Sequence, residues 1–149
     1  SPAKVAPVIC YESIYGDFIT EYIRNGANLI FIITNDGWWE NTAGHRQHFQ
    51  YARLRAVETR RSIARSANTG ISAFINQRGD VFMPTKYWTP DVITMQIKAN
   101  NRLTFYARFG DYIGHISKYI SLLFILIFFM TMLLNKRKRI KIKKTKTQG

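Results

Sequence analysis

The chain has 149 residues and a formal net charge of +13, a length that suits one ordinary domain. Eight of the 22 basic residues lie between Lys136 and Lys146 with no acid among them, so the rest of the chain carries 14 bases against nine acids. The basic excess therefore belongs to the tail and does not mark the whole chain as a nucleic-acid binder. A single cysteine, Cys10, excludes an internal disulfide framework.

The first residues contain no signal peptide. The chain begins with Ser1 and enters an apolar run within ten residues. We therefore expect it to be a fragment of a longer protein, with about 110 residues available for a water-exposed body once the apolar stretch near the end is subtracted.

The first three predicted elements form a βαβ-like unit. Ala6–Cys10 and Ala27–Ile33 are apolar runs typical of strands in layered α/β sheets whose two faces are covered. Between them, Ile14–Arg24 places apolar residues three to four positions apart, which predicts an amphipathic helix that ends at Asn25–Gly26.

The next segments predict a second helix and then β structure. Gly44–Ala67 has apolar residues, Ile63 among them, near one face, and Asn68–Gly70 ends it. The last three predicted strands are Ile71–Asn76, Val81–Met83, which can pair with it as a hairpin, and Val92–Ile97.

Residues Ile113–Leu134 form an apolar run long enough for about 33 Å of helix, which can cross a bilayer. Lys118 does not forbid this, because a long lysine side chain near one end can reach the interface. The alternative is a buried core helix or an interfacial helix, which an apolar surface on every side disfavours.

The basic cluster that starts at Lys136 follows this run directly. It fits the positive-inside pattern, which places the C-terminus in the cytoplasm and the body on the other side of the membrane. Nucleic-acid binding is the alternative for the tail, but the tail has no aromatic residue for stacking on bases.

Cys10 stands where the first predicted strand meets the first helix. A sharp turn there exposes a nucleophile, and the N–H groups of the following turn can stabilise an oxyanion. The helix N-terminus also favours thiolate over thiol. The alternative is an inert, buried cysteine.

Five short motifs follow one another in a recognisable order. They are Val8–Glu12 (VICYE), Thr34–Trp39 (TNDGWW), Gln47–His48, Arg53–Glu58 (RLRAVE) and Asn68–Ser72 (NTGIS). Together they resemble the apolipoprotein N-acyltransferases, membrane enzymes with a nitrilase-type domain of the carbon-nitrogen hydrolase superfamily. The resemblance covers residues 5–111, and the terminal apolar run fits the same family.

The resemblance implies an α/β fold, namely the C-terminal part of a nitrilase-like αββα sandwich followed by one transmembrane helix. Residues 1–111 would belong to the catalytic domain, residues 112–134 would span the membrane and residues 135–149 would form a basic cytoplasmic tail. Loss of half the sandwich would leave apolar sheet surface exposed.

By the same resemblance, Cys10 is the nucleophile that takes an acyl chain from a phospholipid as a thioester. The acceptor is the N-terminal amine of the lipid-modified cysteine of an apolipoprotein. Tyr11 would supply its backbone N–H to the oxyanion hole, and Glu12 would support the site through hydrogen bonds. The family's general-base Glu and oxyanion-stabilising Lys precede the cysteine by tens of residues, so we expect both to be missing here and the isolated chain to be inactive.

The family further implies a monomer in the bacterial inner membrane, within a multi-pass parent whose catalytic domain is periplasmic. We expect no cofactor, no nucleic acid and no metal, since no group of His, Cys, Asp or Glu has metal-ligand spacing.

Other polar and aromatic residues allow two interpretations each. Trp38 and Trp39 can dip into the membrane interface or pack on the base of their own loop. Arg55 and Glu58 resemble a structural ion pair of nitrilase folds more than catalytic groups. His48 fits a capping or packing residue better than a ligand.

Three functions remain open at this stage. The first is the lipid-to-protein acyltransferase, and the second is a membrane-anchored amidase of the same superfamily, in which water replaces the amine acceptor. The third is a non-catalytic, membrane-anchored binding protein with an inert Cys10. The adjoining apolar span favours the first over the second, and the consecutive motifs argue against the third.

Overall fold

The computed structural model describes residues 2–146 and, within them, the side chains of residues 2–136. The chain divides into two compact units between Asp111 and Tyr112. The first unit holds a five-stranded sheet with its helices, and the second is one long helix. Each unit is described by itself, and residues 147–149 of the predicted tail lie outside the described part.

The sheet has its strands in chain order, β1-β2-β3-β4-β5. The first three strands are parallel, and β4 and β5 continue the sheet as an antiparallel hairpin. The strands are β1 (Val5–Ile9), β2 (Leu29–Thr34), β3 (Ser62–Ala67), β4 (Ala73–Ile75) and β5 (Val81–Phe82). The predicted βαβ-like unit is thereby confirmed.

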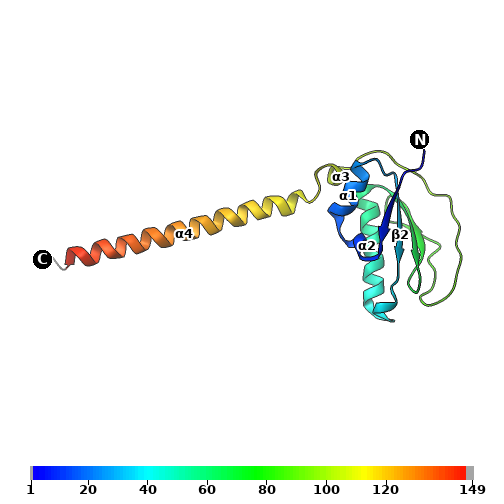
Figure 1. Cartoon of the computed structure of the whole chain (residues 1–149), viewed down its shortest axis with the longest axis horizontal. Helices are drawn as coiled ribbons and strands as arrows, with labels where there is room; N and C mark the ends of the chain where they lie inside the picture. Colours follow the sequence, from blue (N-terminus) through cyan, green and yellow to red (C-terminus); the bar gives the residue numbers. More distant parts are fainter. Residues whose placement is uncertain (1, 147–149) are drawn as a thin grey trace. The chain divides into compact units, whose positions relative to one another are not determined.

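Helices between the parallel strands, and one helix after β5, cover one face of the sheet (Figure 1). They are the short 3-10 helices η1 (Cys10–Ile14) and η2 (Gly37–Trp39) and the α-helices α1 (Gly16–Arg24), α2 (Ala43–Thr59) and α3 (Phe105–Phe109). Alternate strand residues point toward them, so Val8 and Ile32 are fully buried. Burying a side chain of this size contributes about 1.5–3 kcal/mol.

The other face of the sheet is apolar and open among the described residues. Ile33 is 62% exposed and Phe31 is 39% exposed, although both lie in the central strand β2. The prediction that the central strands are covered on both faces is therefore wrong for this chain. The exposed apolar face agrees with the expectation of one half of a sandwich.

The predicted helix Gly44–Ala67 is correct only as far as Thr59. Arg60 adopts the left-handed conformation (φ 52°) and ends α2, and Ser62–Ala67 is the strand β3. Ile63 points into the core from this strand and not from a helix. Parallel pairing with β2 overrides the helical spacing in this stretch.

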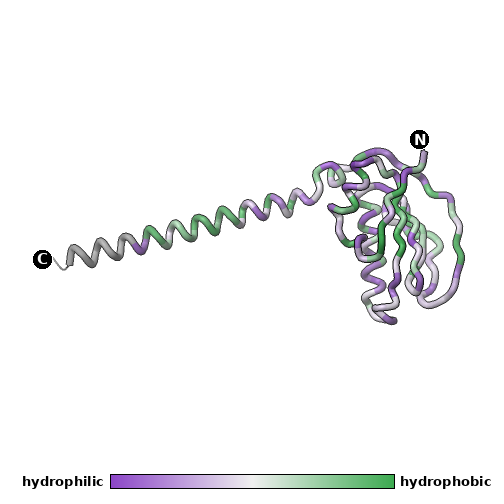
Figure 2. The backbone as a smooth tube through the Cα atoms, viewed as in Figure 1, coloured by the Kyte–Doolittle hydropathy of each residue, from purple (hydrophilic) through white to green (hydrophobic). Residues whose placement is uncertain are grey.

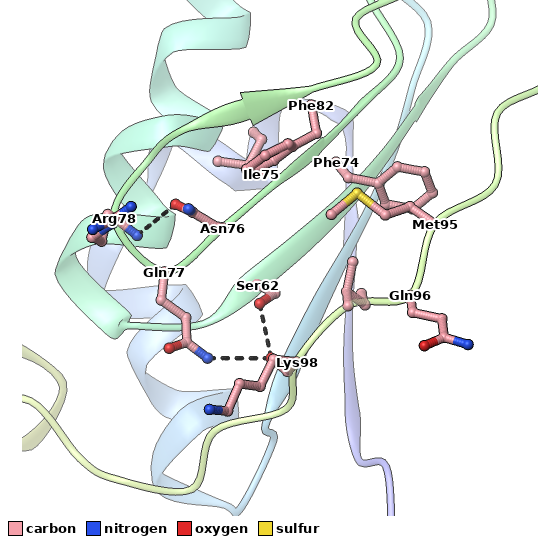
Figure 3. Close-up of a pocket in the computed structure, with 11 residues that line it drawn as sticks. Ser62, Phe74, Ile75, Asn76, Gln77, Arg78, Phe82, Met95, Gln96 and Lys98 are labelled. Atoms are coloured by element: carbon pink, nitrogen blue, oxygen red, sulfur yellow. Dashed lines mark hydrogen bonds between the residues drawn. The ribbon is translucent and has the colours of Figure 1, made fainter.

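The predicted strand Val92–Ile97 is also wrong. Residues 91–98 run over the open sheet face instead of joining an edge: Asp91–Ile93 lie against Phe31 and Ile33 of β2. Residues 95–98, with Phe74 and Phe82, line a cavity of about 340 Å³ (Figure 3). The carbonyl of Lys98 accepts hydrogen bonds from the side chains of Ser62 and Gln77, at 2.8 and 3.2 Å (Figure 3). A segment that crosses a face in this way cannot form a backbone ladder.

The second unit is the single helix α4 (Tyr112–Lys146). Its part Tyr112–Lys136 is long and apolar enough to cross a membrane, by length and composition (Figure 2). This extends the predicted span Ile113–Leu134 by one residue at the start and two at the end. The structure does not describe the side chains of the basic cluster beyond Lys136. The cytoplasmic location of the basic tail therefore stays a prediction.

Candidate functional site

Cys10 lies at the junction of β1 and η1 and adopts a left-handed backbone conformation, with φ of 49°. Residues other than glycine rarely adopt this conformation, which costs on the order of 1–3 kcal/mol and clusters at functional sites. The side chain is only partly buried. This is the sharp strand-to-helix turn that the sequence predicted at Cys10.

The thiol is next to the end of the neighbouring parallel strand. Thr34, the last residue of β2, places its Oγ1 3.3 Å from Sγ of Cys10. The hydroxyl of Thr34 also lies 3.1 Å from Oδ1 of Asp36. The carboxyl ends of β1 and β2 therefore bring the Cys10 motif and the Thr34–Asp36 motif together, as parallel pairing requires.

Glu12 braces the backbone that leads into the turn. Its carboxylate Oε2 accepts a hydrogen bond of 2.7 Å from the backbone N–H of Ile9, the residue before Cys10. A bond to an ionised acceptor is stronger than a neutral one. The contact supports the expectation that Glu12 holds the site by hydrogen bonding, and its catalytic importance stays a prediction.

Two buried side chains contact the backbone carbonyl of Cys10. The hydroxyl of Ser13 donates to this carbonyl at 2.8 Å, and Nε2 of His48 lies 3.2 Å from the same oxygen. Ser13 Oγ and His48 Nε2 are 3.0 Å apart. His48 comes from α2, so the turn at Cys10 is held by a helix that lies far away in the sequence.

His48 is in turn held by a buried carboxylate and a buried guanidinium. Its Nδ1 is 2.9 Å from Oδ1 of Asp36, and Nη2 of Arg65 donates to the other oxygen, Oδ2, at 2.7 Å. Burial alone would raise the pKa of Asp36, but hydrogen bonds from His48 and Arg65 and the positive charge of both outweigh it and lower the pKa to about 2.

Tyr11 and Trp39 pack against each other next to the turn at Cys10. The ring of Tyr11 stacks on Trp39 with centroids 6.0 Å apart. Trp39 also packs on Gly44, so closely that a Cβ added to Gly44 would lie 2.5 Å from the indole ring. Trp38 is 84% exposed. One tryptophan thus packs on the base of its own loop, and the other is free to contact a partner.

The expected ion pair is present, away from the thiol. Arg55 Nη1 lies 3.0 Å from Oε2 of Glu58. Burial raises the pKa of Glu58 and Asp17 adds to this, while Arg55 opposes it. The two residues lie three positions apart on α2, so the ion pair links successive turns of one helix, in accordance with a structural role.

The sequence pointed to Cys10 and Glu12 but not to the buried side chains of Asp36, His48 and Arg65 that hold the turn at Cys10. The positions of Thr34 and Asp36 at a strand end next to Cys10 were a usable signal. Arg65 was missed because β3 was expected to be helical. For His48, which was expected only to cap or pack, the sequence carries no signal of its contact with the nucleophile's carbonyl.

The arrangement offers a thiol on a rigid turn, followed by backbone N–H groups that are free of helical partners. Glu12 and His48 hold the backbone around Cys10, not its thiol. The chemistry that such an arrangement suits is nucleophilic attack on an acyl carbonyl, with the oxyanion facing the start of η1.

Comparisons with known proteins agree with this geometry. Residues 2–104 match the family described as Carbon-nitrogen hydrolase. The chain is 37% identical over 115 residues, 77% of its length, to an apolipoprotein N-acyltransferase of Chlorobaculum tepidum, of which this covers 22%. It is 54% identical over 79 residues, 53% of its length, to the enzyme of the same name from Allorhizobium ampelinum, of which this covers 15%.

Solved structures show the same fold at low sequence identity. A carbon-nitrogen hydrolase from Helicobacter pylori G27 superposes with a TM-score of 0.51 at 11% identity, over 56% of this chain and 36% of that one. Saccharomyces cerevisiae Nit3, a member of the nitrilase superfamily, gives 0.50 at 18% identity, over 58% and 34%. The chain spans about a fifth of the length of the curated relatives it matches.

Proposed function

The chain belongs to the carbon-nitrogen hydrolase family, and from this premise we propose that it is the nucleophile-bearing, C-terminal part of an apolipoprotein N-acyltransferase. The observation that carries the proposal is the left-handed Cys10 at the junction of β1 and η1. It stands within residues 2–104, which match the carbon-nitrogen hydrolase family, and the chain is 37% identical over 115 residues to a relative named apolipoprotein N-acyltransferase.

The first half-reaction forms an acyl-enzyme. The Cys10 thiolate attacks the carbonyl of a phospholipid ester, a C–S bond forms, and collapse of the tetrahedral intermediate breaks the C–O bond. The lysophospholipid leaves as an alcohol after it takes up a proton. The Tyr11 N–H stabilises the oxyanion of the intermediate, and Glu12 keeps the turn in place through Ile9.

The second half-reaction regenerates the enzyme. The α-amine of the lipid-modified cysteine at the start of an apolipoprotein attacks the thioester. The C–N bond forms, the C–S bond breaks, and the amine's proton returns to the sulfur through the general base. An amine acceptor requires a site that is open to lipid, which suits a domain adjoining the candidate span Tyr112–Lys136.

A base and a second oxyanion donor complete the site. A free thiol is only a few per cent thiolate at neutral pH, so acyl transfer needs an activating group. Glu12 bonds the Ile9 N–H and His48 contacts the Cys10 carbonyl, so neither side chain is placed to activate the thiol. We assign these tasks to a glutamate and a lysine from outside the 149 residues, as the resemblance implies.

We place the protein in the bacterial inner membrane, as a monomer. The body carrying Cys10 faces the periplasm and the basic tail faces the cytoplasm, since the basic cluster follows the apolar helix directly. Such a cluster adds about 1 kcal/mol per charge of attraction to anionic headgroups.

The acceptor distinguishes the proposal from its alternatives. The complete gene product, purified in detergent, is given phospholipid and a synthetic peptide that begins with a lipid-modified cysteine. The expected product is that peptide with an added amide-linked acyl chain. Release of ammonia from small amides without peptide acylation would identify an amidase, and the absence of both reactions would identify a non-catalytic binding protein.

A further inference from the structure

The peptide bond between Cys10 and Tyr11 joins two functional groups. Its carbonyl belongs to Cys10 and its N–H to Tyr11, and the chain has no cis peptide bond among its described residues. In a trans peptide the C=O and N–H vectors point in opposite directions within one rigid plane. Whatever holds the carbonyl therefore also sets the direction of the Tyr11 N–H.

The carbonyl end of this plane is held by two buried side chains. Ser13 Oγ donates to it at 2.8 Å, and His48 Nε2 lies 3.2 Å away. Ser13 is 1% exposed and His48 is 2% exposed, so packing restrains both side chains that contact the carbonyl. The N–H end lies at the start of η1, where a helix leaves its first N–H groups without internal partners.

His48 cannot easily turn away from this carbonyl. Its Nδ1 is 2.9 Å from the Asp36 carboxylate, and Arg65 and Thr34 fix the two oxygens of that carboxylate. Asp36 and the Arg65 side chain are wholly buried. Buried hydrogen bonds of this kind restrain the imidazole, and removing Asp36 or Arg65 leaves the other's buried charge unpaired.

We propose that Ser13 and His48, with Asp36 behind them, are positioning residues of the oxyanion hole. They hold the Cys10 carbonyl and so direct the Tyr11 N–H at the oxyanion of the acyl intermediate. This rests on the proposed function and deepens it, since it explains how the site keeps its donor aimed. Neither residue touches the substrate.

The test compares two reactions of the same thiol in the complete gene product. Acylation by phospholipid develops an oxyanion, whereas alkylation by iodoacetamide does not. The variants are His48→Leu, His48→Gln, which keeps an N–H donor, and Ser13→Ala, which removes only a hydroxyl. His45→Leu is the matched control, because His45 is also buried on α2 but contacts the carbonyl of Glu40.

We expect the acylation rate at saturating phospholipid to fall about 10²-fold in His48→Leu and about 10-fold in Ser13→Ala, the scale of a misaligned or lost oxyanion donor. His48→Gln recovers part of the loss. The half-saturating phospholipid concentration and the alkylation rate stay within about twofold of the parent, as do all rates of His45→Leu.

Acylation near the parent rate in both Ser13→Ala and His48→Leu would overturn the proposal. An equal fall of acylation and alkylation would also overturn it, since it would show a purely structural role. An activated nitrophenyl ester serves as a second acyl donor. If the parent reacts with the ester but not with phospholipid, the proposed function fails while the variants still test the positioning; if it reacts with neither, both fail.

Discussion

At the scale of single residues, the backbone of Cys10 is strained and neighbouring side chains hold it in that conformation. The left-handed Cys10 is flanked by a bond from the Ile9 N–H to Glu12 on one side and by the grip of Ser13 and His48 on its carbonyl on the other. Strain of about 1–3 kcal/mol persists only where surrounding contacts over-determine it. The contacts around Cys10 are therefore expected to matter more for rate than for folding.

Removing the acceptor at Glu12 tests this directly. Glu12→Ala should lower acyl transfer by about 10-fold or more, because the Ile9 N–H loses a charge-assisted bond worth about 1.5–3 kcal/mol. Glu12→Gln should retain more activity, since its amide oxygen can still accept. Rates are compared with the amount of protein in the membrane; equal activity of the Ala variant and the parent would refute the bracing role.

Acid should destabilise the body through Asp36. Its pKa is lowered from 3.8 to about 2 in the folded protein, so the stability it contributes is present above 3.8 and is lost as pH falls through 2. Asp36→Asn should be less stable at neutral pH and lose less stability between pH 4 and pH 2. Thermal unfolding across this range measures both; parallel curves for parent and variant would contradict the prediction.

At the scale of elements, the sheet was largely predictable and its support network was not. Local apolar runs are strong signals for β1 and β2, and the Cys10 turn follows from their βαβ spacing. The strand β3 was not predictable, because its pairing with β2 is a tertiary contact that local spacing does not encode. Because β3 was expected to be helical, the sequence could not place Arg65 beside Asp36, and the buried contacts of Arg65, Asp36 and His48 were not predicted.

Gly70, in the loop after β3, allows a prediction about stability. A Cβ at Gly70 would come within 2.1 Å of Asp36 Oδ2, so Gly70→Ala must displace the carboxylate from Arg65. Breaking a buried pair costs about 3–5 kcal/mol, so the apparent melting temperature should drop by about 10 °C or more. Gly37→Ala is the control, since its nearest neighbours are side-chain oxygens of Asn35 and Thr69 at 3.1 Å. An equal drop in both variants would contradict the specific clash.

At the scale of the whole molecule, the chain combines a half-covered α/β body with one apolar helix. The open sheet face and the short share of the relatives' length are both explained if further residues complete the domain. The part Tyr112–Lys136 of α4 is long and apolar enough to cross a membrane, and our proposed orientation rests on the basic cluster at its C-terminal end.

Orientation is tested by reporter fusions after Gly149 in the complete gene product. Green fluorescent protein should fluoresce there, and alkaline phosphatase should be inactive, because the tail is expected in the cytoplasm. Replacing the basic residues of 136–146 by glutamine should weaken this preference. Active phosphatase on the unmodified tail would refute the proposed topology.

The central claim is that Cys10 carries the acyl chain, and the mass of one peptide tests it most directly. Trypsin should release Val5–Arg24, which contains the chain's single cysteine. After incubation with phospholipid and no acceptor, we predict this peptide heavier by the mass of one acyl chain, returned to its original mass by neutral hydroxylamine, and unmodified in Cys10→Ala. An undiminished acyl-enzyme in Cys10→Ala, or no acylated Val5–Arg24 in the parent, would contradict the account.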